Sequence, residues 1–182
     1  MSHRYALIND SHRGQTEKIA LRIARVLRGL GDEAIVYKLH CLPEGFEPEK
    51  FDSLIIGAPI HLKRFSHGLS ELVDDLKPTL SSKPSFFFSV SLSAAEEGSG
   101  QAEAQRCIDE VLSRSAWSPS ATASFAGALR YRRYHPLLRW IMQRLVRTAG
   151  GGTDTSRNYE YTDWEEVEAF GRRCYEELKA SS

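Results

Sequence analysis

Two hydroxyl residues and a glycine stand close together in the segment Ser11–Thr16. The segment follows a short apolar run, Arg4–Asn9, and leads into Gln15–Leu30, where apolar residues recur at helical spacing. The N–H groups and positive dipole end of a helix start, joined by hydroxyls, can hold a phosphate, and glycine lets the backbone approach it. The segment matches neither the dinucleotide-binding glycine fingerprint nor the P-loop of nucleoside triphosphatases. The alternative is a capped connection without a ligand.

Strand and helix signals alternate along the chain, which is typical of a parallel sheet built from βαβ units. The expected strands are Arg4–Asn9, Glu33–Leu39, Asp52–Ala58, Ser85–Leu92 and Thr122–Leu129. The expected helices are Gln15–Leu30, Gly68–Lys77, Gln101–Ser115 and a last helix that begins at Thr162–Trp164. We therefore predict an α/β fold with one doubly wound, five-stranded parallel sheet. Ligands of such sheets bind beyond the carboxyl ends of the strands, so the place of Ser11–Thr16 after the first strand favours a ligand site.

Two further loops are expected at the same edge of the sheet, after the third and fourth strands. They can flank a flat ring whose phosphate lies on the first loop. The candidate cofactor-binding residues of the three loops are Ser11, His12, Arg13, Gly14, Gln15 and Thr16, then Ala58, Pro59, Ile60 and His61, then Ser89, Val90, Ser91 and Leu92.

These motifs carry a resemblance to a known family. Ser11–Thr16 looks like the phosphate loop of the flavodoxin superfamily, whose FMN binds at this edge. More narrowly, the chain from Tyr5 to about Leu178 is similar to the menaquinone-dependent protoporphyrinogen IX dehydrogenases. The segments that carry this likeness are Ile56–Ile60, Phe88–Leu92, Ala126–Tyr131, Gly151–Thr155 and Tyr161–Glu165.

The resemblance implies a flavodoxin-like fold with strand order 2-1-3-4-5 and FMN as cofactor. It implies oxidation of protoporphyrinogen IX to protoporphyrin IX in haem synthesis, with electrons passed to a membrane quinone, menaquinone or ubiquinone. The chain departs from the family at Asp10, where a hydroxyl residue is usual, and at His61–Phe65, which replaces a more aromatic stretch. A carboxylate beside a phosphate is unfavourable unless it points away or pairs with Arg13 or His12.

A basic segment at about residues 130–152 interrupts the alternation before the last helix, within a single domain of residues 1–182. Between Ala116 and Thr153 there are six arginines and no carboxylate, and at 100° per residue Leu137–Val146 has one apolar side. We expect substrate or membrane contacts from Arg130, Arg132, Arg133, Arg139, Trp140, Arg144 and Arg147. The arginines suit anionic lipid head groups or porphyrin propionates. An ordinary surface helix is the alternative.

The composition narrows the possible partners, metal content and location of the protein. Lys+Arg and Asp+Glu number 24 each, and without a recognised binding module we expect no nucleic-acid partner. The three cysteines form no CxxC pair, and we expect no metal. Lacking a signal peptide and a spanning run, the protein is expected in the cytoplasm, peripherally attached to the inner face of the membrane.

The activity has rivals, and the catalytic residues are unknown. His61 and His67 are candidates for proton handling, but a solvated role is the alternative. The rival functions are a flavodoxin-type electron carrier, a general FMN-dependent quinone reductase and, because of Asp10, a flavin-free scaffold. The sequence leaves the formation of a homo-oligomer open.

Overall fold

The computed structural model describes residues 2–11, 14–92, 94, 99–130 and 158–181. Five parallel strands form one sheet in the order β2-β1-β3-β4-β5, which confirms the predicted topology. The strands are β1 (Arg4–Asn9), β2 (Glu33–Lys38), β3 (Ser53–Pro59), β4 (Ser85–Ser91) and β5 (Ala121–Ala126).

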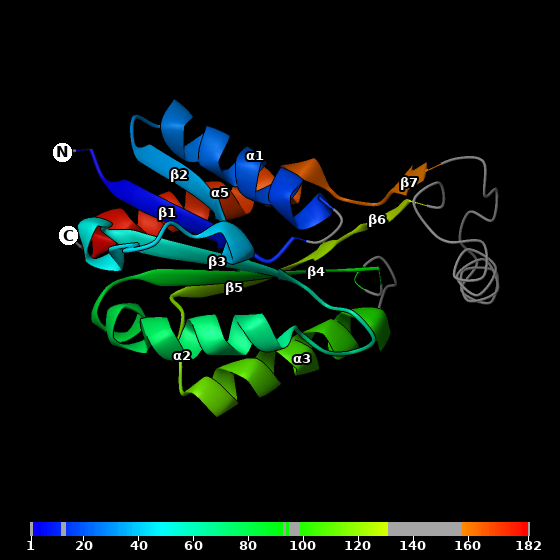
Figure 1. Ribbon diagram of the computed structural model, residues 1–182. Coiled ribbons are helices and arrows are strands. Elements are labelled where there is room, and N and C mark those ends of the chain that lie inside the picture. The colour runs from blue at the N-terminus through cyan, green and yellow to red at the C-terminus, as the bar shows by residue number, and fades with distance from the viewer. Residues whose placement is uncertain (1, 12–13, 93, 95–98, 131–157, 182) are drawn as a thin grey trace.

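Helices cover both faces of the sheet (Figure 1). α1 (Gln15–Gly29) and α5 (Trp164–Ala180) lie on one face, and α2 (His67–Ser82) and α3 (Ser99–Ser115) lie on the other. Two short 3-10 helices, η1 (Leu39–Cys41) and η2 (Pro48–Lys50), connect β2 to β3. A two-stranded antiparallel ribbon, β6 (Ala128–Arg130) and β7 (Asn158–Glu160), extends from the end of β5.

The alternation of side chains along each strand builds two cores. In β1, Tyr5 and Leu7 belong to the core beneath α1 and α5, whereas Ala6 and Ile8 belong to the core beneath α2 and α3. In β4, Phe87 faces the opposite layer from its neighbours Phe86 and Phe88. Both faces of these strands are buried, which explains their nearly continuous apolar runs.

α2 is longer than expected. The sequence predicts its end at about Lys77, directly before Pro78, which lacks an N–H group and crowds the preceding turn. In the structure the helix continues through Pro78 to Ser82. Leu76 and Leu80, before and after the proline, are both buried in the core, so apolar burial outweighs the lost hydrogen bond.

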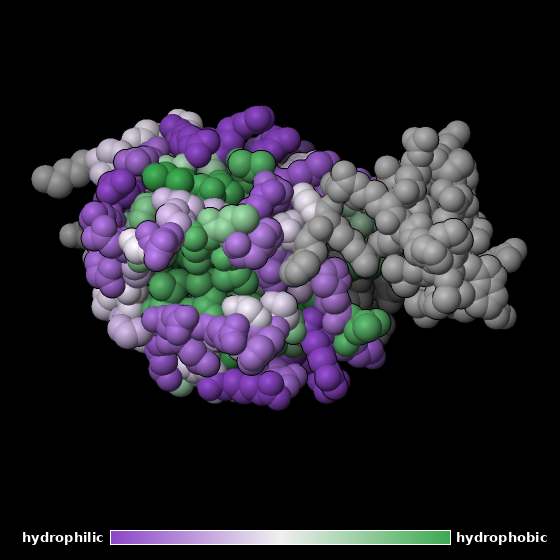
Figure 2. All heavy atoms as spheres, in the orientation of Figure 1, coloured by the Kyte–Doolittle hydropathy of each residue, from purple (hydrophilic) through white to green (hydrophobic). Residues whose placement is uncertain are grey.

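The described surface is mainly polar. Figure 2 shows an apolar central area framed by polar side chains on the side of the molecule seen in Figure 1. Among the described residues, the exposed large apolar side chains are Leu21, Leu30, Leu62 and Tyr161, and Leu62 is 96% exposed. No helix of the described segments is both long and apolar enough to cross a bilayer.

Candidate functional site

The loop after β1 closes on itself at the start of α1. The Ser11 hydroxyl oxygen accepts a hydrogen bond from the Gly14 N–H at 2.9 Å. Gly14 has φ 86°, a left-handed conformation that glycine adopts without strain. Thr16, in the first turn of α1, is only 2% exposed. The Ser11 hydroxyl and the Gly14 amide therefore meet at the N-terminal end of α1.

The start of α1 lacks the side-chain cap that α2 and α5 have. Ser66 caps α2 by accepting from the Leu69 N–H at 3.1 Å, and Asp163 caps α5 by accepting from the Glu165 N–H at 2.8 Å. At α1 the cap residue is Gly14, and among the described residues no side chain forms a cap hydrogen bond there. An anion at this position would supply the missing acceptor and interact favourably with the helix dipole.

Two carboxylates near this turn have partners of their own. Glu17, in the first turn of α1, forms an ion pair with Lys38 at 3.1 Å. Asp10 is 4% exposed, and its carboxylate accepts a hydrogen bond from the hydroxyl of Ser66, the cap of α2. The Asp10 charge is thus held at the positive end of α2. The sequence indicates Arg13 and His12 as possible partners of Asp10. It does not identify Ser66, which lies 56 residues further along the chain.

A buried relay fixes the start of α1 to the sheet edge. The Gln15 side-chain amide donates to the Thr162 hydroxyl oxygen at 2.9 Å, and that hydroxyl donates to the Ala126 carbonyl oxygen at 2.7 Å. Gln15 and Thr162 are less than a tenth exposed. The relay joins α1, the end of β5 and the residue before the α5 cap. The sequence allows either Thr162 or Asp163 to cap the last helix, and Asp163 fills that role.

The loops after β3 and β4 lie side by side at the same edge. The Ile60 N–H donates to the Val90 carbonyl oxygen at 2.8 Å, and the Gly127 N–H donates to the Ser91 carbonyl oxygen at 2.9 Å. The Ser91 hydroxyl oxygen accepts from the Ala94 N–H at 3.0 Å. The structure therefore places Ile60, after β3, and Gly127, after β5, beside the carboxyl end of β4.

Not every candidate side chain points to the edge. Ala58 and Val90 belong to the buried cores, and the buried Ser89 hydroxyl donates to the Ser124 hydroxyl at 3.1 Å. Any contact of these residues with a ligand therefore falls to their backbone. His12, Arg13 and the basic candidates Arg132, Arg133, Arg139, Trp140, Arg144 and Arg147 lie outside the described residues, and of Arg130 only the place in β6 is described.

The candidate proton carriers lie at the surface. The His67 side chain is 88% exposed and lies 3.3 Å from Glu71 on the first turns of α2. His61 is exposed at the start of a turn after β3. Burial raises the pKa of the Tyr5 hydroxyl and of the Cys174 thiol, but both side chains lie in the core beneath α1 and α5. In the described part of the chain, His, Cys, Asp and Glu form no group suited to a metal ion.

Comparison with known proteins decides the family. Residues 6–156 match the family model described as a flavodoxin domain. Over 159 residues, 87% of each chain, the protein is 36% identical to protoporphyrinogen IX dehydrogenase (quinone) of Escherichia coli strain K12. The chain belongs to the flavodoxin-domain protoporphyrinogen IX dehydrogenase family. This membership confirms the resemblance that the sequence motifs indicate.

Other family members and solved structures agree with this placement. The Leishmania major protoporphyrinogen IX dehydrogenase (quinone) is 35% identical over 120 residues, which cover 66% of this chain and 52% of that protein. Oxidised flavodoxin 1 from Bacillus cereus superposes with a TM-score of 0.59 at 19% identity, covering 95% of this chain and 97% of that chain. A flavodoxin domain with this fold implies a flavin cofactor.

Proposed function

We propose that this protein binds FMN at the carboxyl edge of its sheet and oxidises protoporphyrinogen IX to protoporphyrin IX, passing the electrons to a membrane quinone. The observation that carries the proposal is the 36% identity to the E. coli dehydrogenase of that name, over 87% of both chains. The uncapped start of α1 supports the cofactor part independently, because it offers amides and a helix dipole to a phosphate.

FMN fits the residues of the edge. The phosphate would lie at the N-terminal end of α1, with Ser11 and Thr16 donating from their hydroxyls and the Gln15 relay holding the start of the helix in place. The backbones of Ala58–His61 and Ser89–Leu92 would flank the ring. The flavin supplies the redox chemistry, while the protein binds it, orients it and limits access of water. No side chain is assigned as catalytic acid or base.

We propose that residues 1–182 form a single domain. Within it, the basic segment of about residues 130–152 would determine which substrate is bound and where in the cell the protein lies. Its arginines would hold the propionates of the tetrapyrrole or anionic lipid head groups, with the apolar side at the acyl chains. A reduced tetrapyrrole and a lipid-dissolved quinone meet most readily at the inner surface of the membrane. We therefore place the protein in the cytoplasm, peripherally attached to that surface.

The activity is tested with the purified full-length protein loaded with FMN. Protoporphyrinogen IX and a quinone analogue are supplied without oxygen, and porphyrin fluorescence reports the product. We expect fluorescence to rise only when protein, FMN and quinone are all present. If the reduced protein exchanges electrons with protein partners but never with the porphyrinogen, the protein is an electron carrier and the proposal fails.

The membrane assignment has a separate test. The triple variant Arg139→Glu, Arg144→Glu, Arg147→Glu should lose co-sedimentation with anionic vesicles and quinone-coupled turnover but keep its FMN. Binding of the parent protein should also weaken as salt shortens the Debye length from ~10 Å at 0.1 M to ~3 Å at 1 M. Normal sedimentation and turnover of the triple variant would show that the segment does not bind membrane through these arginines.

A further inference from the structure

A strained turn follows β3 at the proposed flavin site. In the turn His61–Arg64, the His61 N–H donates to the Arg64 carbonyl oxygen at 2.9 Å, and the Arg64 N–H donates to the His61 carbonyl oxygen at 3.1 Å. The two central residues, Leu62 and Lys63, have φ values of 51° and 61°. Such turns favour asparagine and glycine at both positions, and neither is present here. Residues held in this conformation persist only when surrounding contacts fix them.

The two ends of the connection between β3 and α2 are anchored to the sheet layer. The Ile60 N–H is bonded to β4, and the Phe65 ring lies edge-on to the buried Phe87 ring with centroids 5.5 Å apart. Ser66 is bonded to Asp10 in the loop after β1. Leu62 is 96% exposed, so its side chain contributes almost no buried surface to the turn. The central residues of the turn therefore need another source of fixation.

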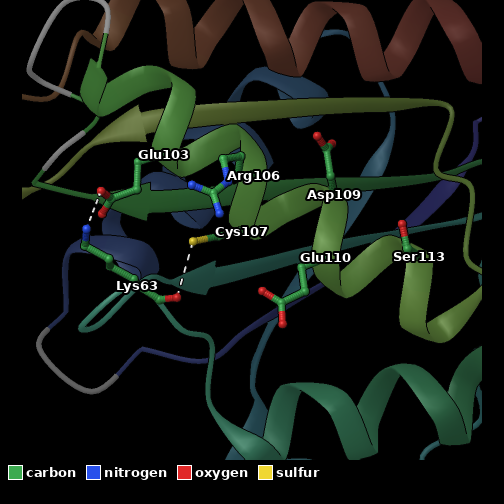
Figure 3. A pocket seen from close by; sticks show the side chains of 7 residues that line it. All are labelled: Lys63, Glu103, Arg106, Cys107, Asp109, Glu110 and Ser113. Atoms are coloured by element: carbon green, nitrogen blue, oxygen red, sulfur yellow. Dashed lines mark hydrogen bonds and ion pairs between the residues drawn. The ribbon is translucent and has the colours of Figure 1, made fainter.

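That source is α3, which binds Lys63 at two points (Figure 3). The Lys63 ammonium forms an ion pair with Glu103 at 2.9 Å, and the Lys63 carbonyl oxygen accepts from the Cys107 thiol at 3.4 Å. Glu103 and Cys107 are four residues apart and so share one side of the helix. Cys107 is 7% exposed, and burial raises the pKa of its thiol, which keeps the donor protonated at neutral pH.

We propose that Glu103 and Cys107 are positioning residues that hold the His61–Arg64 turn in its left-handed conformation beside the flavin. The inference rests on the proposed FMN site. α3 also follows the loop after β4, the second loop expected to flank the ring. The two contacts with Lys63 therefore set the separation of the two flavin-flanking loops.

The test compares Glu103→Gln with the matched control Glu110→Gln. Both carboxylates line the same groove of about 430 Å³ beside Cys107, and both raise the pKa of its thiol. Glu110, however, forms its ion pair with Arg114 of the same helix, at 2.8 Å. A purely electrostatic effect on the thiol therefore appears in both variants, and loss of the turn contact appears only in Glu103→Gln.

The first readout is the rate at which a disulfide reagent labels Cys107 in the full-length apo-protein, with Cys41 and Cys174 replaced by serine. We expect Glu103→Gln to label about two- to fivefold faster than Glu110→Gln at low salt, from the usual strength of a partly exposed ion pair. The labelling is followed against pH so that a change in thiol pKa is separated from a change in access. The difference should disappear at 1 M salt.

The second readout is the FMN dissociation constant, measured by quenching of flavin fluorescence. It should rise about two- to fivefold in Glu103→Gln and stay unchanged in Glu110→Gln. The exchange Lys63→Glu with Glu103→Lys should restore it, and Cys107→Ser should retain more affinity than Cys107→Ala because serine keeps a donor.

Equal labelling and equal FMN affinity of the two glutamine variants would overturn the inference while leaving the proposed function intact. If the parent protein binds no FMN, the proposed function fails, and the labelling of the apo-protein still decides whether α3 holds the turn.

Discussion

Replacing Gly57 by alanine should destabilise the fold through one identified contact. Gly57 lies in the central strand β3 opposite Phe88 of β4, and a Cβ built at Gly57 would lie 2.1 Å from the Phe88 Cζ, whereas ordinary contact begins at 3.4 Å. The ring cannot withdraw easily, since it is fully buried with the Phe125 and Phe170 ring centroids at 5.9 and 6.4 Å.

Over-packing of a core costs ~1–3 kcal/mol, and the absence of space here places Gly57→Ala near 3 kcal/mol. For a chain of this size that corresponds to a fall in Tm of about 6–12 °C. The loss should be measured by urea unfolding of the apo-protein, because bound FMN would add its own stabilisation.

A double-mutant cycle isolates the contact. Phe88→Leu alone should cost about 1–2 kcal/mol by shortening a buried side chain. If the ring is what excludes a Cβ, the double variant Gly57→Ala, Phe88→Leu should be more stable than Gly57→Ala alone, with a coupling of about 3 kcal/mol, because removing the ring removes the whole cost of the clash. Strictly additive free energies of unfolding would refute the reasoning, because they would show that glycine is needed for a reason other than the Phe88 ring.

Three further changes test the site and its supports. Thr16→Ala should weaken FMN binding roughly ten- to hundredfold, the effect of losing one hydrogen bond to a charged acceptor, while Thr16→Ser should retain the affinity; fluorescence titration measures both. Asp163→Ala removes the cap of α5 and should cost about 1 kcal/mol in urea unfolding, with Asp163→Asn losing less. Tyr5→Phe should raise the free energy of unfolding by about 1 kcal/mol, because the buried Tyr5 hydroxyl has no hydrogen-bond partner among the described residues. Burial raises the pKa of Tyr5 above its usual 10.0, so the unfolded chain loses this proton first and stability falls as the pH rises past 10; Tyr5→Phe should flatten that fall in a pH series of unfolding curves.

The elements that sequence reasoning located well are those whose signals are local. The apolar run Leu54–Ile56 indicates a buried strand, and Gly31 indicates a helix end, without any knowledge of the rest of the chain. The structure has both, and Gly31 has φ 94°. The helix start at Gln15 was located in the same way, because a hydroxyl, a glycine and a helical pattern lie within the six residues Ser11–Thr16; that this segment holds a phosphate stays a prediction.

The contacts that sequence reasoning missed depend on distant partners. Ser66 meets Asp10 across 56 residues, and Gln15 meets Thr162 across 147, so no spacing rule could pair them. The left-handed conformation of Leu62 and Lys63 could not be predicted locally, because neither residue is glycine or asparagine. Contacts with α3 fix this conformation, not the residue types of the turn. The extension of α2 beyond Pro78 likewise depends on a core that only the folded chain defines.

The pairing of β6 with β7 has a consequence for how this fold can diversify. Arg130 and Asn158 pair across the ribbon, so the residues on either side of the segment 131–157 lie at neighbouring positions. Segments of different length and composition can be joined to such a stem at little entropic cost, since loop closure depends only weakly on length. Residues 131–157 can therefore be exchanged between relatives as a cassette, or replaced by a two-residue Asn-Gly turn, while the five-stranded sheet keeps its sequence. Evolution and protein engineering can thus vary this segment without rebuilding the five-stranded sheet.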